Sequence, residues 1–125
     1  MTIARSALDT LSDILREPKT AIVRDASIQR FEYTFEALWK AAQMFLRTVE
    51  SLDAGSPKSA IRASFRIGLL GEDEAPTALS MADDRNLTVH TYNESLAERI
   101  YSNLAHYAPV MHRWLSAMEI RLPER

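Results

Sequence analysis

One long apolar repeat, over residues 22–51, constrains the fold of this chain more than any other feature. Apolar side chains recur there at spacings that alternate between three and four, the period of one face of an α-helix: Ile28, Phe31, Phe35, Leu38, Ala42, Phe45 and Val49. A helix of about 30 residues is about 45 Å long, so the other segments must pack along it. The repeat predicts a central bundle helix with enough apolar surface for a homodimer interface.

Shorter segments with the same period predict the remaining helices. The pattern favours helices over residues 3–16, 57–69 and 74–91, and Asn93 is suited to cap a last helix. The chain has no β-branched run of five or more residues between turn signals, so no strand is predicted. We therefore expect an all-α fold, an up-down antiparallel bundle of four to five helices.

Length and composition limit the class of protein. The 125 residues are expected to form one domain, with a short N-terminal helix within residues 1–18 and a core bundle over residues 20–120. The net charge of −2 gives no overall basic field, so DNA is not an expected partner. The chain has no cysteine and no signal-peptide core, and no apolar run approaches the roughly 20 residues of a membrane helix. These features favour a cytoplasmic protein without membrane contact.

Familiar catalytic and cofactor motifs are absent from the sequence. It contains no phosphate-binding GxxxxGK[ST] loop, no GxGxxG turn, no HExxH zinc motif and no GxSxG nucleophile motif. The three histidines are His90, His106 and His112, and their spacings place no two of them on one helix face. We therefore expect neither a metal site nor a bound cofactor.

A polar cluster between two helical patterns is the candidate functional site. Arg85, Asn86, His90 and Tyr92 lie within eight residues of one another. An arginine can neutralise a phosphate and a histidine can move a proton near neutral pH. Together they suffice for metal-free cleavage of RNA, because the ribose 2′-hydroxyl supplies the nucleophile. The other interpretation is a polar helix face on which the arginine pairs with one of the two preceding aspartates, Asp83 or Asp84.

Helical geometry sets a condition on that chemistry. Arg85 and His90 are five positions apart, which is roughly 140° around an ideal helix. Arg85 and Tyr92, seven positions apart, nearly share one stripe. The arginine and the histidine can meet at one phosphate only if the helix ends or distorts near His90, or if a second subunit completes the site.

The same residues resemble a known family. Arg85-x4-His90-x-Tyr92 is similar to the R-x4-H-x-Y motif of HEPN domains, in the HepT-like branch of nucleotidyltransferase substrate-binding proteins. The segment Arg24–Lys40 is similar to the second-helix pattern of that branch, and the resemblance covers about residues 20–115. One departure is Ala78, where the family often has a tryptophan.

The resemblance implies a function and a set of roles. It implies an antiparallel HEPN-like bundle that forms a homodimer and acts with a cognate minimal nucleotidyltransferase. Family members that are toxins are metal-independent RNases. By this resemblance Arg85 would stabilise the scissile phosphate, Asn86 would assist it, and His90 would act as general acid and base. Tyr92 would be the hydroxyl that the partner adenylylates to silence the toxin.

Three interpretations follow, and the sequence leaves open whether the protein is an enzyme. The first is the RNase toxin of a toxin–antitoxin pair, with RNA as substrate. The second is a non-catalytic subunit that binds substrate for the nucleotidyltransferase or serves as its scaffold. The third is a dimeric helical protein whose motif is vestigial. Five further polar residues are candidates for contacts with the cleft, the partner or RNA: Arg24, Asp25, Arg30, Arg62 and Arg66.

Overall fold

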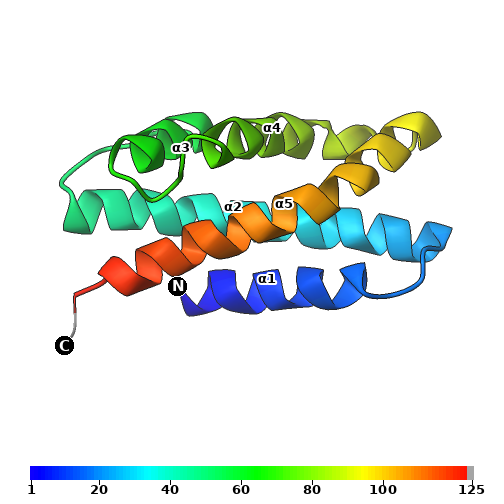
Figure 1. The fold of residues 1–125 in the computed structure, drawn as a ribbon. Helices are drawn as coiled ribbons and strands as arrows, with labels where there is room; N and C mark the ends of the chain where they lie inside the picture. Colours follow the sequence, from blue (N-terminus) through cyan, green and yellow to red (C-terminus); the bar gives the residue numbers. More distant parts are fainter. Residues whose placement is uncertain (124–125) are drawn as a thin grey trace.

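A computed structural model describes residues 1–123, and over that range every regular element is a helix. Five α-helices and one 3-10 helix follow in chain order: α1 (Thr2–Leu15), α2 (Ala21–Val49), α3 (Pro57–Arg66), α4 (Glu74–Leu87), η1 (Thr88–His90) and α5 (Glu94–Arg121). In Figure 1, α1 lies along one side of α2, α3 and α4 follow one another along the other side, and α5 crosses α2. The predicted all-α bundle is confirmed.

The long helix α2 is the centre of the bundle, because it contacts all four other α-helices. The apolar stripe predicted from its sequence faces the core, and Phe31, Phe35 and Phe45 are buried there. Only the last member of the stripe, Val49, is half-buried. Burial of a large apolar side chain contributes about 1.5–3 kcal/mol, so this stripe supplies a large share of the stability.

Helix α3 begins where the sequence predicts and ends earlier. The Ser56 side chain accepts a hydrogen bond from the Ser59 backbone N–H, and Pro57 occupies the first turn. The predicted end at residue 69 is wrong, because Gly68 adopts a positive φ of 80°. The following residue, Leu69, then donates its backbone N–H to the Ser64 carbonyl at 2.8 Å. This left-handed cap closes the helix, and a residue with a side chain would be strained at that φ.

Helix α4 also ends earlier than predicted, at Leu87 instead of residue 91. The Thr88 hydroxyl donates to the Arg85 carbonyl at 2.8 Å, and the chain tightens there into the 3-10 turn η1. Asn93 then caps α5, as predicted, by accepting the Leu96 backbone N–H at 3.2 Å. Side-chain hydrogen bonds to the backbone compete with helix continuation, and here they place a turn between the two halves of the polar cluster.

A half-buried histidine, His112, joins α5 to α1. Its Nδ1 lies 3.3 Å from Nη1 of Arg5, and its Nε2 lies 2.8 Å from the Ser12 hydroxyl. The guanidinium can only donate, so Nδ1 accepts and the ring proton sits on Nε2. Burial, together with the nearby Arg5 charge, lowers the pKa of His112 below its ordinary value. The neutral ring is therefore the form that fits the fold.

We expect the free energy of unfolding to fall as the pH drops below about 6.5, and His112→Gln to flatten this slope. A histidine whose pKa is lower in the folded chain binds fewer protons there than in the unfolded chain, so acid favours unfolding. Urea unfolding between pH 7.5 and 5.5 measures the effect above the range in which carboxylates titrate. His106→Gln is the matched control, because His106 is an exposed residue of the same helix. An equal slope in wild type and His112→Gln would contradict the prediction.

Candidate functional site

Arg85 lies near the end of α4 and packs against α2. Its Nε is 3.2 Å from a Glu36 carboxylate oxygen, and its Nη2 is 3.8 Å from a Glu32 oxygen. Its Nη1 lies 3.3 Å from the Thr88 hydroxyl. The Arg85 side chain is 23% exposed, so it is mostly enclosed but still reachable from solvent. Two carboxylates of α2 thus hold the guanidinium in place and offset its charge.

The two aspartates before this arginine have other partners, so the predicted pairing with either of them is wrong. Asp83 forms an ion pair with Lys58 at 2.7 Å. The buried Asp84 accepts hydrogen bonds from the Tyr107 hydroxyl at 2.6 Å and the Asn103 amide at 3.0 Å. Burial, followed by the bond to Asp84, raises the pKa of Tyr107. Asp84 therefore fastens α4 to α5 beside the site.

A hollow of about 260 Å³ lies in front of Arg85 and Asn86. Lys58 and Ser56 at the start of α3 line its other side, and Glu36 closes it from α2. Two cations and an amide suit a phosphate or a carboxylate, whereas the Glu36 carboxylate repels one. Both cations are already ion-paired, Arg85 with Glu36 and Lys58 with Asp83. The hollow can therefore hold an anionic group only by competing with these ion pairs.

His90 and Tyr92 lie on the turn that connects α4 to α5. The Tyr92 hydroxyl is 3.3 Å from Nδ1 of His90, and the two rings meet edge to face with centroids 5.9 Å apart. Tyr92 is 83% exposed. The Thr91 hydroxyl donates to the Thr88 carbonyl at 3.1 Å, and the Asn93 N–H donates to the His90 carbonyl at 3.0 Å. These bonds hold the exposed pair on a defined turn.

The polar cluster is thus divided into two parts. Arg85 and Asn86 line the hollow beside α3, whereas His90 contacts Tyr92. Among the hydrogen bonds and ion pairs of residues 1–123, none joins Arg85 to His90. The helix ends near His90, as the geometric condition required, yet the end does not bring these two side chains into contact in one chain. Completion of the site by a second subunit stays a prediction.

Arg24 is buried and forms a network of ion pairs with three carboxylates. Its side chain is 6% exposed, and it donates to Asp25 at 2.9 Å, to Glu94 at 2.6 Å and to Glu98 at 3.0 Å. The hydrogen bond to Glu94, followed by those to the other two carboxylates, raises the pKa of Arg24. The network ties the start of α2 to the start of α5, which is the helix that follows the His90–Tyr92 turn.

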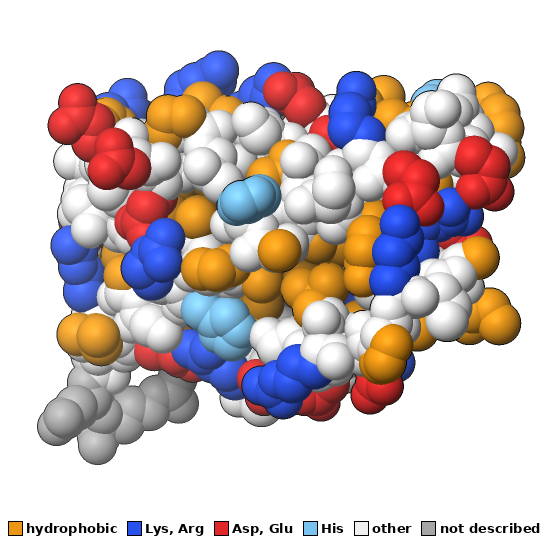
Figure 2. Space-filling model, turned by 45° about the vertical axis from the view of Figure 1, so that its right-hand side comes forward, with side chains coloured by type: hydrophobic (Ala, Val, Ile, Leu, Met, Phe, Trp, Pro, Cys, Tyr) orange, Lys and Arg blue, Asp and Glu red, His pale blue; other side chains and the backbone are white. Residues whose placement is uncertain are grey.

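The remaining predicted contact residues lie apart from the hollow. Arg30 donates to the Thr10 carbonyl at 2.8 Å and so links α2 to α1. Arg62 and Arg66 lie on the exposed face of α3 and are not part of the core. On the face drawn in Figure 2, Lys and Arg side chains lie among Asp and Glu side chains and form no field of one sign.

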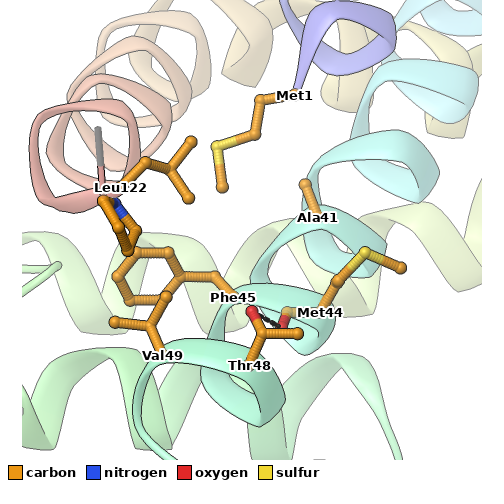
Figure 3. A pocket seen from close by; sticks show the side chains of 8 residues that line it. Met1, Ala41, Met44, Phe45, Thr48, Val49 and Leu122 are labelled. Atoms are coloured by element: carbon orange, nitrogen blue, oxygen red, sulfur yellow. Dashed lines mark hydrogen bonds between the residues drawn. The ribbon is translucent and has the colours of Figure 1, made fainter. Parts of the chain in front are cut away.

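A larger apolar hollow, of about 480 Å³, lies elsewhere on the molecule. Figure 3 shows Phe45 and Val49 of α2 near Leu122, with Met1 pointing into the same space. It contains none of the predicted site residues, and no charged side chain of the described residues lines it. We therefore place the candidate site at Arg85–Tyr92 and not at the larger hollow.

The side chains that contact the site residues were not predicted from the sequence. Glu32 and Glu36 appear in the sequence only as part of the polar face of the long helix, and Lys58 only as a residue after a helix start. Their spacing of four does place both glutamates on one face of α2, and this spacing was the only sign in the sequence that they could act together.

Within residues 1–123, no group of three or more His, Asp or Glu side chains is arranged to hold a metal ion. Over the same range no helix is both long and apolar enough to cross a membrane.

Comparison with known families decides the relationship. The family described as "Nucleotidyltransferase substrate binding protein like" matches residues 2–120. The chain belongs to this family. The match includes α1, so it extends beyond the segment in which the sequence resemblance was found. The resemblance to the nucleotidyltransferase substrate-binding branch is confirmed.

Solved structures share the fold of this substrate-binding family member. A protein from Thermus thermophilus is 51% identical, with a TM-score of 0.88 over 92% of this chain and 98% of that chain. HI0074 from Haemophilus influenzae is 20% identical, with a TM-score of 0.80 over 94% of this chain and 98% of that one. Its structure is described as the fold of a substrate-binding domain of a nucleotidyltransferase, and at this identity the likeness shows the fold alone. Comparison with curated protein sequences found no significant match.

Proposed function

We propose that this protein is the non-catalytic substrate-binding subunit of a minimal nucleotidyltransferase. Membership of the substrate-binding family supports a nucleotidyltransferase as partner. The hollow beside Arg85 and Asn86 offers two cations and an amide, which suit the phosphate or carboxylate of a substrate. The chain binds and presents a substrate group, and the partner supplies the transfer chemistry.

The separation of Arg85 from His90 is the observation that favours binding over RNA cleavage. Metal-free cleavage requires a cation and a proton-transfer group at the same phosphate. Here the guanidinium lies between Glu32 and Glu36, and the imidazole lies against Tyr92. A single chain therefore presents an anion-binding group and a proton acceptor at two neighbouring places.

We further propose that the partner transferase adenylylates Tyr92. The hydroxyl is exposed on a connecting turn, where the active site of another protein can reach it. An attached nucleotide adds a negative phosphodiester and considerable bulk beside His90. Adenylylation at this position would therefore change what the neighbouring surface can bind.

The second candidate is the metal-independent RNase toxin. Its support is the exposed position of His90 close in sequence to the Arg85 hollow. A homodimer that places His90 of one copy against the hollow of the other would complete a cleavage site. In this case adenylylation of Tyr92 would silence the RNase.

Expression of the chain without the transferase separates the two functions. We expect normal growth, no RNA cleavage that depends on His90, and co-elution of the two proteins from a sizing column when both are expressed. Arg85→Ala is expected to weaken binding of the phosphate-bearing substrate by about tenfold or more, the effect of losing one charge-assisted hydrogen bond. Growth arrest that His90→Ala relieves would overturn the binding function and establish the RNase.

A further inference from the structure

We propose that His90 accepts the proton of the Tyr92 hydroxyl when that hydroxyl is adenylylated, so that the acceptor chain supplies the base for its own modification. The proposal rests on the proposed function of Tyr92 as the acceptor. It adds a catalytic role for a residue of the substrate protein. Transferase and acceptor would then form a complete active site only when they are together.

The geometry of the pair fits a proton transfer. The Tyr92 oxygen lies 3.3 Å from Nδ1 of His90, close to hydrogen-bond distance in the unbound chain. The rings meet at 86°, so the edge of one ring faces the other and the hydroxyl is not covered. With the ring proton on Nε2, Nδ1 is the acceptor. Both side chains are exposed, which leaves room for a triphosphate to approach the oxygen.

The turn fixes this arrangement before any partner binds. The residues stand two apart at the end of η1, and hydrogen bonds from the Thr91 hydroxyl and the Asn93 N–H close the turn around them. Asn93 also caps the long helix α5. Preorganisation of this kind reduces the entropy lost when reacting groups are aligned.

Among the four tyrosines of the chain, Tyr92 alone has an imidazole as the partner of its hydroxyl. The hydroxyl of Tyr33 lies against a threonine hydroxyl, and that of Tyr107 is buried on the Asp84 carboxylate. Tyr101 is half-buried. Burial, followed by the bond to Asp84, raises the pKa of Tyr107 and keeps this phenol protonated, whereas an exposed imidazole can take the proton and release it to water.

The proposed step balances with a nucleoside triphosphate as co-reactant. In its neutral form the imidazole of His90 carries a lone pair on Nδ1 that can accept the phenolic proton. The proton moves from the Tyr92 oxygen to Nδ1 of His90 as that oxygen bonds to the α-phosphorus. The bond from the α-phosphorus to the bridging oxygen breaks, and pyrophosphate leaves with the electron pair. The imidazolium then returns its proton to solvent, and nothing is oxidised or reduced.

The test measures initial rates of adenylylation with the purified transferase, ATP and full-length variants. Intact mass spectrometry follows the added adenylyl group. We expect His90→Ala and His90→Gln to slow the reaction by about 100-fold, although glutamine can still hydrogen-bond to the tyrosine. Added imidazole is expected to restore much of the rate of His90→Ala. His106→Ala is the matched control, an exposed histidine of α5, and should react at the wild-type rate.

The outcomes distinguish the inference from the proposed function. A wild-type rate in His90→Ala overturns the role of His90 and leaves Tyr92 as the acceptor. A slow His90→Ala that imidazole does not accelerate, with a wild-type rate in His90→Gln, also overturns proton transfer and leaves a positioning role. Adenylylation that persists in Tyr92→Phe, or a wild type that is never modified, overturns the acceptor itself and the inference with it. Thermal melting of each variant establishes that the comparison is between folded proteins.

Discussion

Tyr92→Phe is expected to abolish adenylylation of this chain by its partner transferase. The substitution removes the only atom that could form the phosphoester at this position and keeps the ring. Because the side chain is 83% exposed and its hydroxyl, within residues 1–123, contacts only the exposed His90, the free energy of unfolding should change by no more than about 0.5 kcal/mol. Intact mass after co-expression measures the result, as an adenylyl increment in wild type and none in the variant.

Tyr33→Phe is the matched control for this experiment. Tyr33 is also exposed, at 41%, but its hydroxyl contacts that of Thr10 and no imidazole. The control should therefore carry the same increment as wild type. An increment that disappears in both variants would indicate a general loss of partner binding, and one that remains in Tyr92→Phe would place the modified hydroxyl elsewhere.

The fold was largely predictable because its dominant signals are local. The period of the apolar residues in α2 and the Ser56–Pro57 start of α3 both act within a few positions, and both are confirmed. The two misplaced helix ends have local causes that the sequence leaves ambiguous. Gly68 takes a positive φ, which glycine permits but does not require. Thr88 turns its hydroxyl back to the chain, which a threonine in mid-helix can also do without ending the helix.

The candidate site was predictable in its residue types but not in its contacts. Arg85, His90 and Tyr92 stand out by their chemistry and spacing, whereas the carboxylate that holds the arginine is Glu36, on another helix and 49 positions away in the sequence. That pairing depends on how α4 packs against α2, which periodicity does not determine. The helix does end before His90, one of the two conditions that the helical wheel set, but this end alone does not bring Arg85 into contact with His90.

Asp84→Ala is expected to lower the free energy of unfolding by about 2–4 kcal/mol. The carboxylate is buried and accepts hydrogen bonds from Tyr107 and Asn103 of α5. Its removal leaves a buried phenol without a partner, and such a group costs more than the hydrogen bond itself contributes. Urea unfolding at pH 7 measures the change. Because Asp84 directly precedes Arg85, the same variant is expected to loosen the α4–α5 contact that supports the site.

A double-mutant cycle with Tyr107→Phe separates this hydrogen bond from general damage to the core. The phenylalanine keeps the ring, which stacks on Phe31 with centroids 5.6 Å apart, and removes only the hydroxyl. If the unpartnered phenol causes most of the loss, Asp84→Ala should be less destabilising in the Tyr107→Phe background, by at least about 1 kcal/mol. Equal losses in the two backgrounds would mean that Asp84 acts through its other contacts. The site would then be supported by Asn103 and the ion pair with Arg99, at 3.6 Å, and not by the buried phenol.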